Sequence, residues 1–160
     1  MPKHFITLMH LKQHEEYSCV PACVQMVLEH YGDRRTEEEL ITLLRCTPFG
    51  TTAKDVRRVA QLGYEVDVTY STFEELQSYL AAGQPIIAFL RTGPLEYWSF
   101  DAPHAVVAIG YDEQVVYIDD PYFDTVPQRT SIALFKQAWW KSKNRMAVIR
   151  PKVEHRNEEE

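Results

Sequence analysis

Hydrophobic residues recur at helical spacing early in the chain. Within residues 20–31 the apolar side chains fall three and four positions apart, Pro21 suits a first helical turn, and Gly32 suits the exit. The polar stretch before them, residues 13–18, has the composition of a loop. We therefore predict a helix that begins near Cys19.

Three further segments of the first half carry signals for the start of a helix. Each opens with a threonine followed three residues later by an acidic residue, the spacing of a capping box, and apolar residues follow. The second and third segments end at Gly63 and Gly83, and a strand is expected at residues 64–70. The starting pairs are Thr36 with Glu39, Thr52 with Asp55, and Thr72 with Glu75.

The second half of the chain has a different pattern, in which short runs rich in β-branched and aromatic residues predict strands. One amphipathic segment, residues 131–141, predicts a helix between them. Helices first and strands second indicate an α+β domain, with a helical N-terminal half packed on an antiparallel sheet from the C-terminal half. The expected strands are residues 85–90, 104–109, 115–118 and 146–149, with a hairpin turn at 111–114.

Composition narrows the possible functions. A chain of 160 residues that is 45% hydrophobic can form one domain, here residues 1–153, before a charged tail at 154–160 that we expect to be disordered. The net charge of −6 argues against nucleic acid as a partner and favours a peptide or a small amide. Without a spanning apolar run or a signal-peptide pattern, we expect no membrane insertion and a cytoplasmic location. The oligomeric state is left open.

Three cysteines, an odd number, argue against a disulfide framework. Cys19 lies in the first turn of the predicted helix, where free backbone N–H groups and the helix dipole stabilise a thiolate. Cys23 lies one turn deeper on the apolar stripe and is interpreted as a small core residue. Cys46 is interpreted in the same way. Cys19 is therefore the candidate nucleophile.

A thiol nucleophile needs a base, and His104 opens an apolar strand directly after a long loop. A hairpin would return Asp119 and Asp120, at the end of the next strand, toward His104. Either carboxylate could orient the base, because neighbouring strand residues point to opposite faces. Loop aromatics Tyr97, Trp98 and Phe100 are interpreted as packing, with groove lining as the alternative. His4, His10, His14, His30 and His155 are interpreted as solvated.

The order of these elements resembles the papain-like cysteine peptidases that cleave bacteriocin and peptide leaders after a double glycine. The resemblance rests on Gln13, Cys19 after five intervening residues, His104 with its apolar strand, and the Asp–Pro pair that begins at Asp120. It implies a papain-like fold with Cys19 as nucleophile, His104 as general base and Asp120 as the orienting acid. Gln13 and the Cys19 N–H would stabilise the oxyanion. We expect no cofactor and no metal. Val20 departs from the family's usual glycine after the nucleophile.

Three hypotheses follow. The first is an enzyme that attacks an amide through Cys19, with a transferase or a deamidase using the same residues. The second is a catalytically idle relative that binds peptides or regulates a partner. The third is a metal site of Cys19, Cys23 and a histidine, which fits poorly because zinc usually recruits four ligands.

Overall fold

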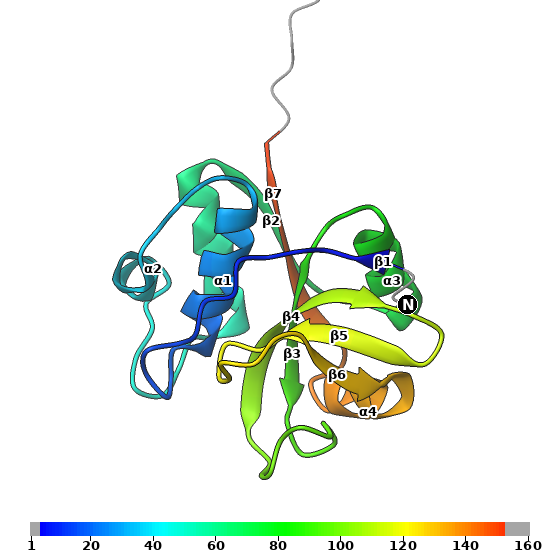
Figure 1. The fold of residues 1–160 in the computed structure, drawn as a ribbon. Coiled ribbons are helices and arrows are strands. Elements are labelled where there is room, and N and C mark those ends of the chain that lie inside the picture. Colours follow the sequence, from blue (N-terminus) through cyan, green and yellow to red (C-terminus); the bar gives the residue numbers. More distant parts are fainter. Residues whose placement is uncertain (1–3, 153–160) are drawn as a thin grey trace, which may run out of the picture.

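The computed structural model describes residues 4–152, so the tail predicted at 154–160 lies outside the described residues. Its centre is an antiparallel sheet with the strand order β2-β7-β3-β4-β5-β6, and β1 pairs with the end of β4 (Figure 1). The strands are β1 (His4–Phe5), β2 (Tyr64–Tyr70), β3 (Ile86–Arg91), β4 (Pro103–Tyr111), β5 (Val115–Asp119), β6 (Gln128–Ser131) and β7 (Arg145–Pro151).

Helices cover both faces of this sheet. On one side lie α1 (Cys19–His30), α2 (Glu37–Leu43) and the 3₁₀ helix η1 (Ala53–Leu62). On the other side lie α3 (Phe73–Ala81) and α4 (Ile132–Trp140) (Figure 1). The α+β class is confirmed, but the sheet also draws on the first half of the chain, because β2 pairs with β7 along its whole length.

The capping signals are confirmed at two of the three predicted sites. The hydroxyl of Thr36 accepts the Glu39 N–H and that of Thr72 accepts the Glu75 N–H, each at 3.1 Å. Thr52 is different, because its hydroxyl donates to the Asp55 carboxylate at 2.8 Å and the segment that follows is a 3₁₀ helix. The capping prediction was therefore wrong at Thr52.

The predicted strands are all present, and β1 and β6 were missed. Both are short, with two and four residues, and β6 has the polar sequence QRTS, which lacks the apolar alternation of a typical strand. β1 adds to β4, about 100 residues later in the chain, whereas β6 adds to β5, the strand directly before it. Local patterning carries no signal for such strands.

A buried interface between α1 and β4 holds the core together. The helix buries an apolar stripe that includes Cys23, Val24 and Val27, each at most 1% exposed. All residues of β4 after Pro103 are buried. The N-terminus of α1 and the start of β4 are consequently fixed relative to each other, because closely packed interiors allow little movement.

Gly110 in β4 is expected to be required for the docking of β1. A Cβ atom at this position would lie 3.0 Å from Phe5 Cα and closer still to the His4 carbonyl oxygen. Gly110→Ala should therefore destabilise the fold by about 1–3 kcal/mol, the usual cost of overpacking. Urea unfolding at pH 7 would measure this loss, and an unchanged midpoint would contradict the prediction.

Candidate active site

Cys19 is the first residue of α1 and is partly exposed. A residue in the first helical turn has a backbone N–H with no acceptor inside the helix. The Cys19 thiol lies close enough to the His104 imidazole to raise the pKa of His104. Helix packing on β4 thus brings the predicted nucleophile and the predicted base together, although 85 positions separate them in the sequence.

His104 lies at the start of β4 and is 9% exposed. Its Nε2 atom is 2.7 Å from Asp120 Oδ1, so Nε2 carries the proton and Nδ1 is the nitrogen left for Cys19. Burial alone would lower the pKa of His104, but the hydrogen bonds and negative charges of Asp120 and Cys19 raise this pKa to about 9. The imidazole therefore holds two protons at neutral pH.

Asp120 is fully buried and accepts four hydrogen bonds. Oδ1 accepts from His104 and from the Tyr122 N–H, and Oδ2 accepts from the Tyr97 hydroxyl and the Trp98 indole, both at 2.9 Å. Burial opposes ionisation, but these donors and the positive charge of His104 prevail and lower the pKa of Asp120. The site therefore holds a carboxylate at neutral pH, with one oxygen reserved for the base and the neighbouring Tyr122 N–H.

Sequence reasoning missed the roles of Tyr97 and Trp98. Both were interpreted as packing or groove residues, whereas their polar atoms hold Asp120 in place. The Trp98 ring also lies edge-on to the imidazole of His104, with ring centroids 4.8 Å apart. A signal was available, because buried tyrosine and tryptophan need acceptors and this loop directly precedes His104. The acceptor itself could not be identified without the fold.

The side chain of Asp119 lies away from His104. It pairs with Val107 in the ladder between β4 and β5, which places its side chain on the opposite face of the sheet from His104. Asp119 is 3% exposed, and burial raises its pKa to about 6, an effect that nearby His10 partly offsets. Of the two carboxylates, the structure brings only Asp120 to the imidazole.

Gln13 is buried beside the segment that follows Asp120. Its backbone N–H donates to the Pro121 carbonyl at 2.8 Å. Its side-chain Nε2 donates to the carbonyls of Glu15 at 2.8 Å and Glu16 at 3.2 Å, which orients the amide within its own loop. A polar pocket adjoins it, lined by Lys12, Gln13, His14, Glu15, Glu16 and Tyr122.

The other two cysteines differ from each other. Cys23 is fully buried, and burial followed by the negative charge of Cys19 raises the pKa of its thiol, as expected for a core residue. Cys46 is only partly buried, and its Sγ lies 3.6 Å from the Tyr17 carbonyl oxygen, so its interpretation as a core residue was wrong. Burial also raises the pKa of Cys46. Neither thiol is activated by its surroundings.

The histidines outside β4 were not all solvated as expected. His10 is partly buried, with Nε2 2.6 Å from the Phe123 carbonyl oxygen. His14 is exposed but lies 3.1 Å from the buried carboxylate of Glu37. His155 lies outside the described residues. Within residues 4–152, no group of three or more His, Cys, Asp or Glu side chains is placed to hold a metal ion.

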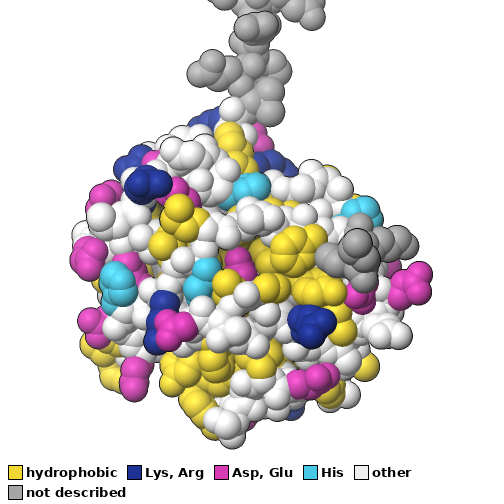
Figure 2. Space-filling model, viewed as in Figure 1, with side chains coloured by type: hydrophobic (Ala, Val, Ile, Leu, Met, Phe, Trp, Pro, Cys, Tyr) yellow, Lys and Arg dark blue, Asp and Glu magenta, His cyan; other side chains and the backbone are white. Residues whose placement is uncertain are grey.

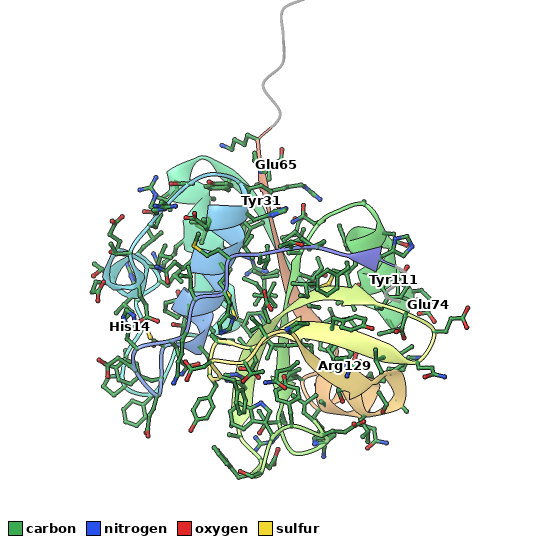
Figure 3. All side chains as sticks on the ribbon, in the orientation of Figure 1. His14, Tyr31, Glu65, Glu74, Tyr111 and Arg129 are labelled. Atoms are coloured by element: carbon green, nitrogen blue, oxygen red, sulfur yellow. The ribbon has the colours of Figure 1, made fainter. Side chains whose placement is uncertain are left out.

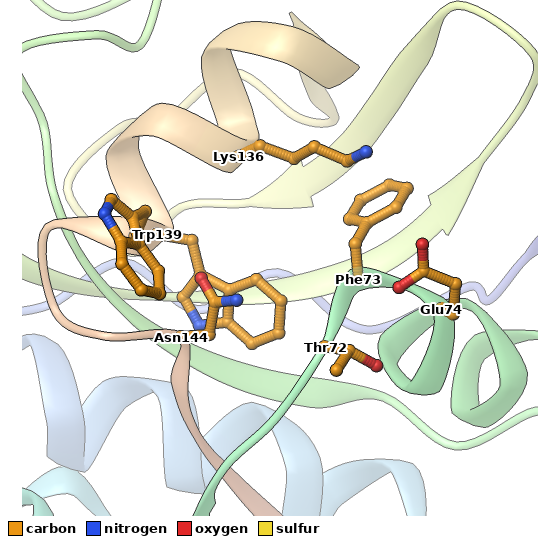
Figure 4. Close-up of a pocket in the computed structure, with 7 residues that line it drawn as sticks. Thr72, Phe73, Glu74, Lys136, Trp139 and Asn144 are labelled. Atoms are coloured by element: carbon orange, nitrogen blue, oxygen red, sulfur yellow. The ribbon is translucent and has the colours of Figure 1, made fainter.

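The surface also has a groove that is separate from the cluster of Cys19, His104 and Asp120. A groove between α3 and α4 is lined by Phe73, Lys136 and Trp139, among others, and includes none of the predicted catalytic residues (Figure 4). On the face in Figure 2, Lys and Arg side chains are scattered, and hydrophobic side chains gather over its lower part.

Over residues 4–152, no helix combines the length and the apolar character needed to cross a membrane.

Asp119→Asn is expected to stabilise the protein at pH 7. The pKa of Asp119 is higher in the folded protein than in the unfolded chain, so ionisation of Asp119 favours unfolding. The loss of stability grows as the pH rises from about 4 to 6 and is complete above that. Because a tenfold change in an ionisation equilibrium is about 1.4 kcal/mol, the gain should be about 1–3 kcal/mol at pH 7 and vanish below pH 4. Urea unfolding at both values would test this, and an equal gain at both would contradict it.

The fold of this chain resembles those of solved proteins. The chain resembles a C39-like peptidase from Bacillus anthracis at 18% identity and a TM-score of 0.79, over 95% of this chain and 100% of that one. It resembles the peptidase domain of Streptococcus ComA, a bifunctional ABC transporter of a quorum-sensing pathway, at 23% identity and a TM-score of 0.74, over 89% and 98%. A double-glycine-motif protease from an AMS/PCAT transporter, solved with its leader peptide, gives 18% identity and a TM-score of 0.73, over 94% and 96%.

These likenesses confirm the predicted papain-like peptidase fold. No curated protein sequence matches the chain. The sequence model of the Peptidase_C39 like family matches residues 5–147, which is most of the chain and includes every residue of the Cys19–His104–Asp120 cluster. The protein therefore belongs to the Peptidase_C39-like family.

Proposed function

We propose that the protein is a cysteine peptidase that cleaves a peptide or a related amide bond through Cys19. The observation that carries this proposal is that one imidazole, that of His104, bonds the buried Asp120 carboxylate at 2.7 Å and lies close enough to the Cys19 thiol for the thiol to raise its pKa. A nucleophile, a base and a group that orients the base are the three parts that acyl transfer requires. The family to which the chain belongs supports the same reaction class.

The reaction begins with the proton of the Cys19 thiol. At neutral pH that proton resides on His104 Nδ1, and the imidazolium stabilises the Cys19 thiolate. The thiolate attacks the carbonyl carbon of the scissile amide, and the C=O electron pair moves to oxygen. When the intermediate collapses, the amine leaves with the proton that His104 returns, and the acyl group remains on Cys19 as a thioester. Water, activated by His104, then releases the acid.

As the thiolate attacks, negative charge develops on the carbonyl oxygen, and hydrogen-bond donors are needed to stabilise it. The Cys19 N–H is available as the first N–H of α1. Gln13 Nε2 would supply the second donor by exchanging its longer bond, the 3.2 Å contact with the Glu16 carbonyl, for the oxyanion. A charged acceptor forms a stronger hydrogen bond than a neutral carbonyl, which favours this exchange.

The substrate we propose is a peptide chain. The double-glycine protease among the structural relatives was solved with a leader peptide, which makes a peptide the natural choice for this chain. Trp98 and Tyr122 flank His104, with ring centroids 4.8 and 6.3 Å from the imidazole, and they offer an apolar wall to side chains near the scissile bond.

Iodoacetamide is expected to label the protein once, at Cys19, and to do so quickly at pH 6–7. The positive charge of His104 persists at this pH because its pKa is about 9, whereas an isolated thiol requires a pH above about 8.5. His104→Ala should slow labelling at pH 6.5 about tenfold or more. Mass spectrometry of the intact protein measures both rates.

Cys23→Ala and Cys19→Ala are the matched controls for this experiment. Cys23 is buried and Cys46 has a raised pKa, so neither thiol should compete near neutral pH. Labelling that persists in Cys19→Ala, or labelling no faster than that of a free thiol, would contradict the proposal and favour the catalytically idle binding module.

Asp120→Asn is expected to slow acylation of Cys19 by p-nitrophenyl acetate, while Asp119→Asn should not. The substitution removes the negative charge that helps to keep His104 protonated. It also places an NH₂ group, which cannot accept a hydrogen bond, beside the donors of Tyr97 and Trp98. We expect a loss of about 10²-fold or more, by analogy with the loss of an orienting carboxylate in other triads. Release of p-nitrophenolate gives the rate, and equal losses in the two variants would contradict the assignment of Asp120.

A further inference from the structure

Glu37 is a buried carboxylate outside the Cys19–His104–Asp120 cluster. It is the first residue of α2 and is 2% exposed. Its oxygens accept the His14 backbone N–H at 3.1 and 3.2 Å and lie 3.1 Å from His14 Nδ1. The Ser18 hydroxyl lies 3.2 Å from Oε1. All of these partners belong to the loop that precedes α1, and Figure 3 shows His14 on that loop beside α2.

Each of the two residues that Glu37 contacts is adjacent in the sequence to a proposed oxyanion donor. His14 directly follows Gln13, and Ser18 directly precedes Cys19. In the proposed reaction, Gln13 and the Cys19 N–H are the two donors to the oxyanion. One carboxylate therefore joins the residues next to both donors and sets the distance between the two ends of the loop.

The remaining contacts of the loop strengthen this arrangement. Ser18 is fully buried, and its hydroxyl accepts the Glu15 N–H at 3.0 Å and lies 3.0 Å from the Glu15 carbonyl oxygen. Gln13 Nε2 donates to the Glu15 carbonyl. Outside the loop, the Pro121 carbonyl accepts the Gln13 N–H and Cys46 Sγ lies 3.6 Å from the Tyr17 carbonyl oxygen, whereas Glu37 contacts both His14 and Ser18 and so ties the loop to α2.

We propose that Glu37 is a positioning residue that holds Gln13 and the Cys19 N–H at the spacing required to stabilise the oxyanion. This inference rests on the proposed function. Misplacement of a catalytic group by about 1 Å can cost about 10²-fold in rate, so the bridge matters to a step in which charge develops on oxygen. It should not affect a reaction that forms no oxyanion, such as direct alkylation of the Cys19 thiolate.

The test compares two reactions of Cys19. Acylation by p-nitrophenyl acetate passes through an oxyanion, whereas alkylation by iodoacetamide displaces iodide without one. Glu37→Leu keeps the side-chain volume but accepts no hydrogen bond, and it should slow acylation about 10- to 100-fold while alkylation changes less than about threefold. Glu37→Gln keeps an oxygen for His14 and Ser18 and should restore acylation to within about threefold of wild type.

Glu39→Leu is the matched control, because it removes the same charge from the same helix at an exposed position whose one ion pair within residues 4–152, with Arg35, is at 3.8 Å. It should leave both rates unchanged. Should Glu37→Leu unfold, as judged by circular dichroism, Ser18→Ala removes one side of the bridge at lower cost and should still slow acylation alone.

Each outcome separates the inference from the proposed function. Equal slowing of acylation and alkylation in Glu37→Leu, or wild-type acylation in that variant, would overturn the role of Glu37 and leave the peptidase proposal intact. A wild-type chain that is alkylated at Cys19 but never acylated there would overturn the proposed function, and the role of Glu37 with it.

Discussion

The hydrogen bond between Asp120 and His104 depends on the negative charge of a carboxylate in the protein interior. Several surrounding segments supply the donors that stabilise this charge. A carboxylate without solvent contact is costly unless donors surround it. Asp120 recruits them from β4, from the loop before β4 and from its own loop, through His104, Tyr97, Trp98 and the Tyr122 N–H. Three segments must therefore meet at one point before the imidazole acquires its orientation and its raised pKa.

Three buried carboxylates in this small domain illustrate how surroundings determine the role of an acid. Asp120 has four donors and a lowered pKa. Glu37 is held by one loop, and burial raises its pKa although His14 and Ser18 partly compensate. Asp119 has its pKa raised to about 6 by burial. The first carboxylate orients a base in the proposed reaction, the second fixes a loop, and the third costs stability near neutral pH.

The rigidity of the site comes from the helix and strand that carry it. Cys19 begins a helix whose buried stripe packs on β4, and His104 begins β4 itself. Such a scaffold keeps the proposed nucleophile and the proposed base close together, because a closely packed interior allows little movement. Of the two proposed oxyanion donors, Gln13 lies on the loop before α1 and lacks this support, which explains why a separate carboxylate from α2 is well placed to act there.

The sequence by itself determined those features that depend on local patterning. The helix at Cys19, the caps at Thr36 and Thr72, the strand that His104 opens and the α+β class all follow from periodicity and from residues a few positions apart. The candidate trio of Cys19, His104 and Asp120 also came from the sequence, with the help of a family resemblance.

Only the tertiary structure decided which side chains meet. The register of β4 and β5 brought Asp120 rather than Asp119 to His104, because a shift of one residue reverses the face of a strand. The contacts of Tyr97 and Trp98 with Asp120, and of Glu37 with the loop before Cys19, join residues about 20 positions apart on different elements. Hydrophobic periodicity specifies which face of an element is buried, but it does not specify the partner that a buried polar atom will find there.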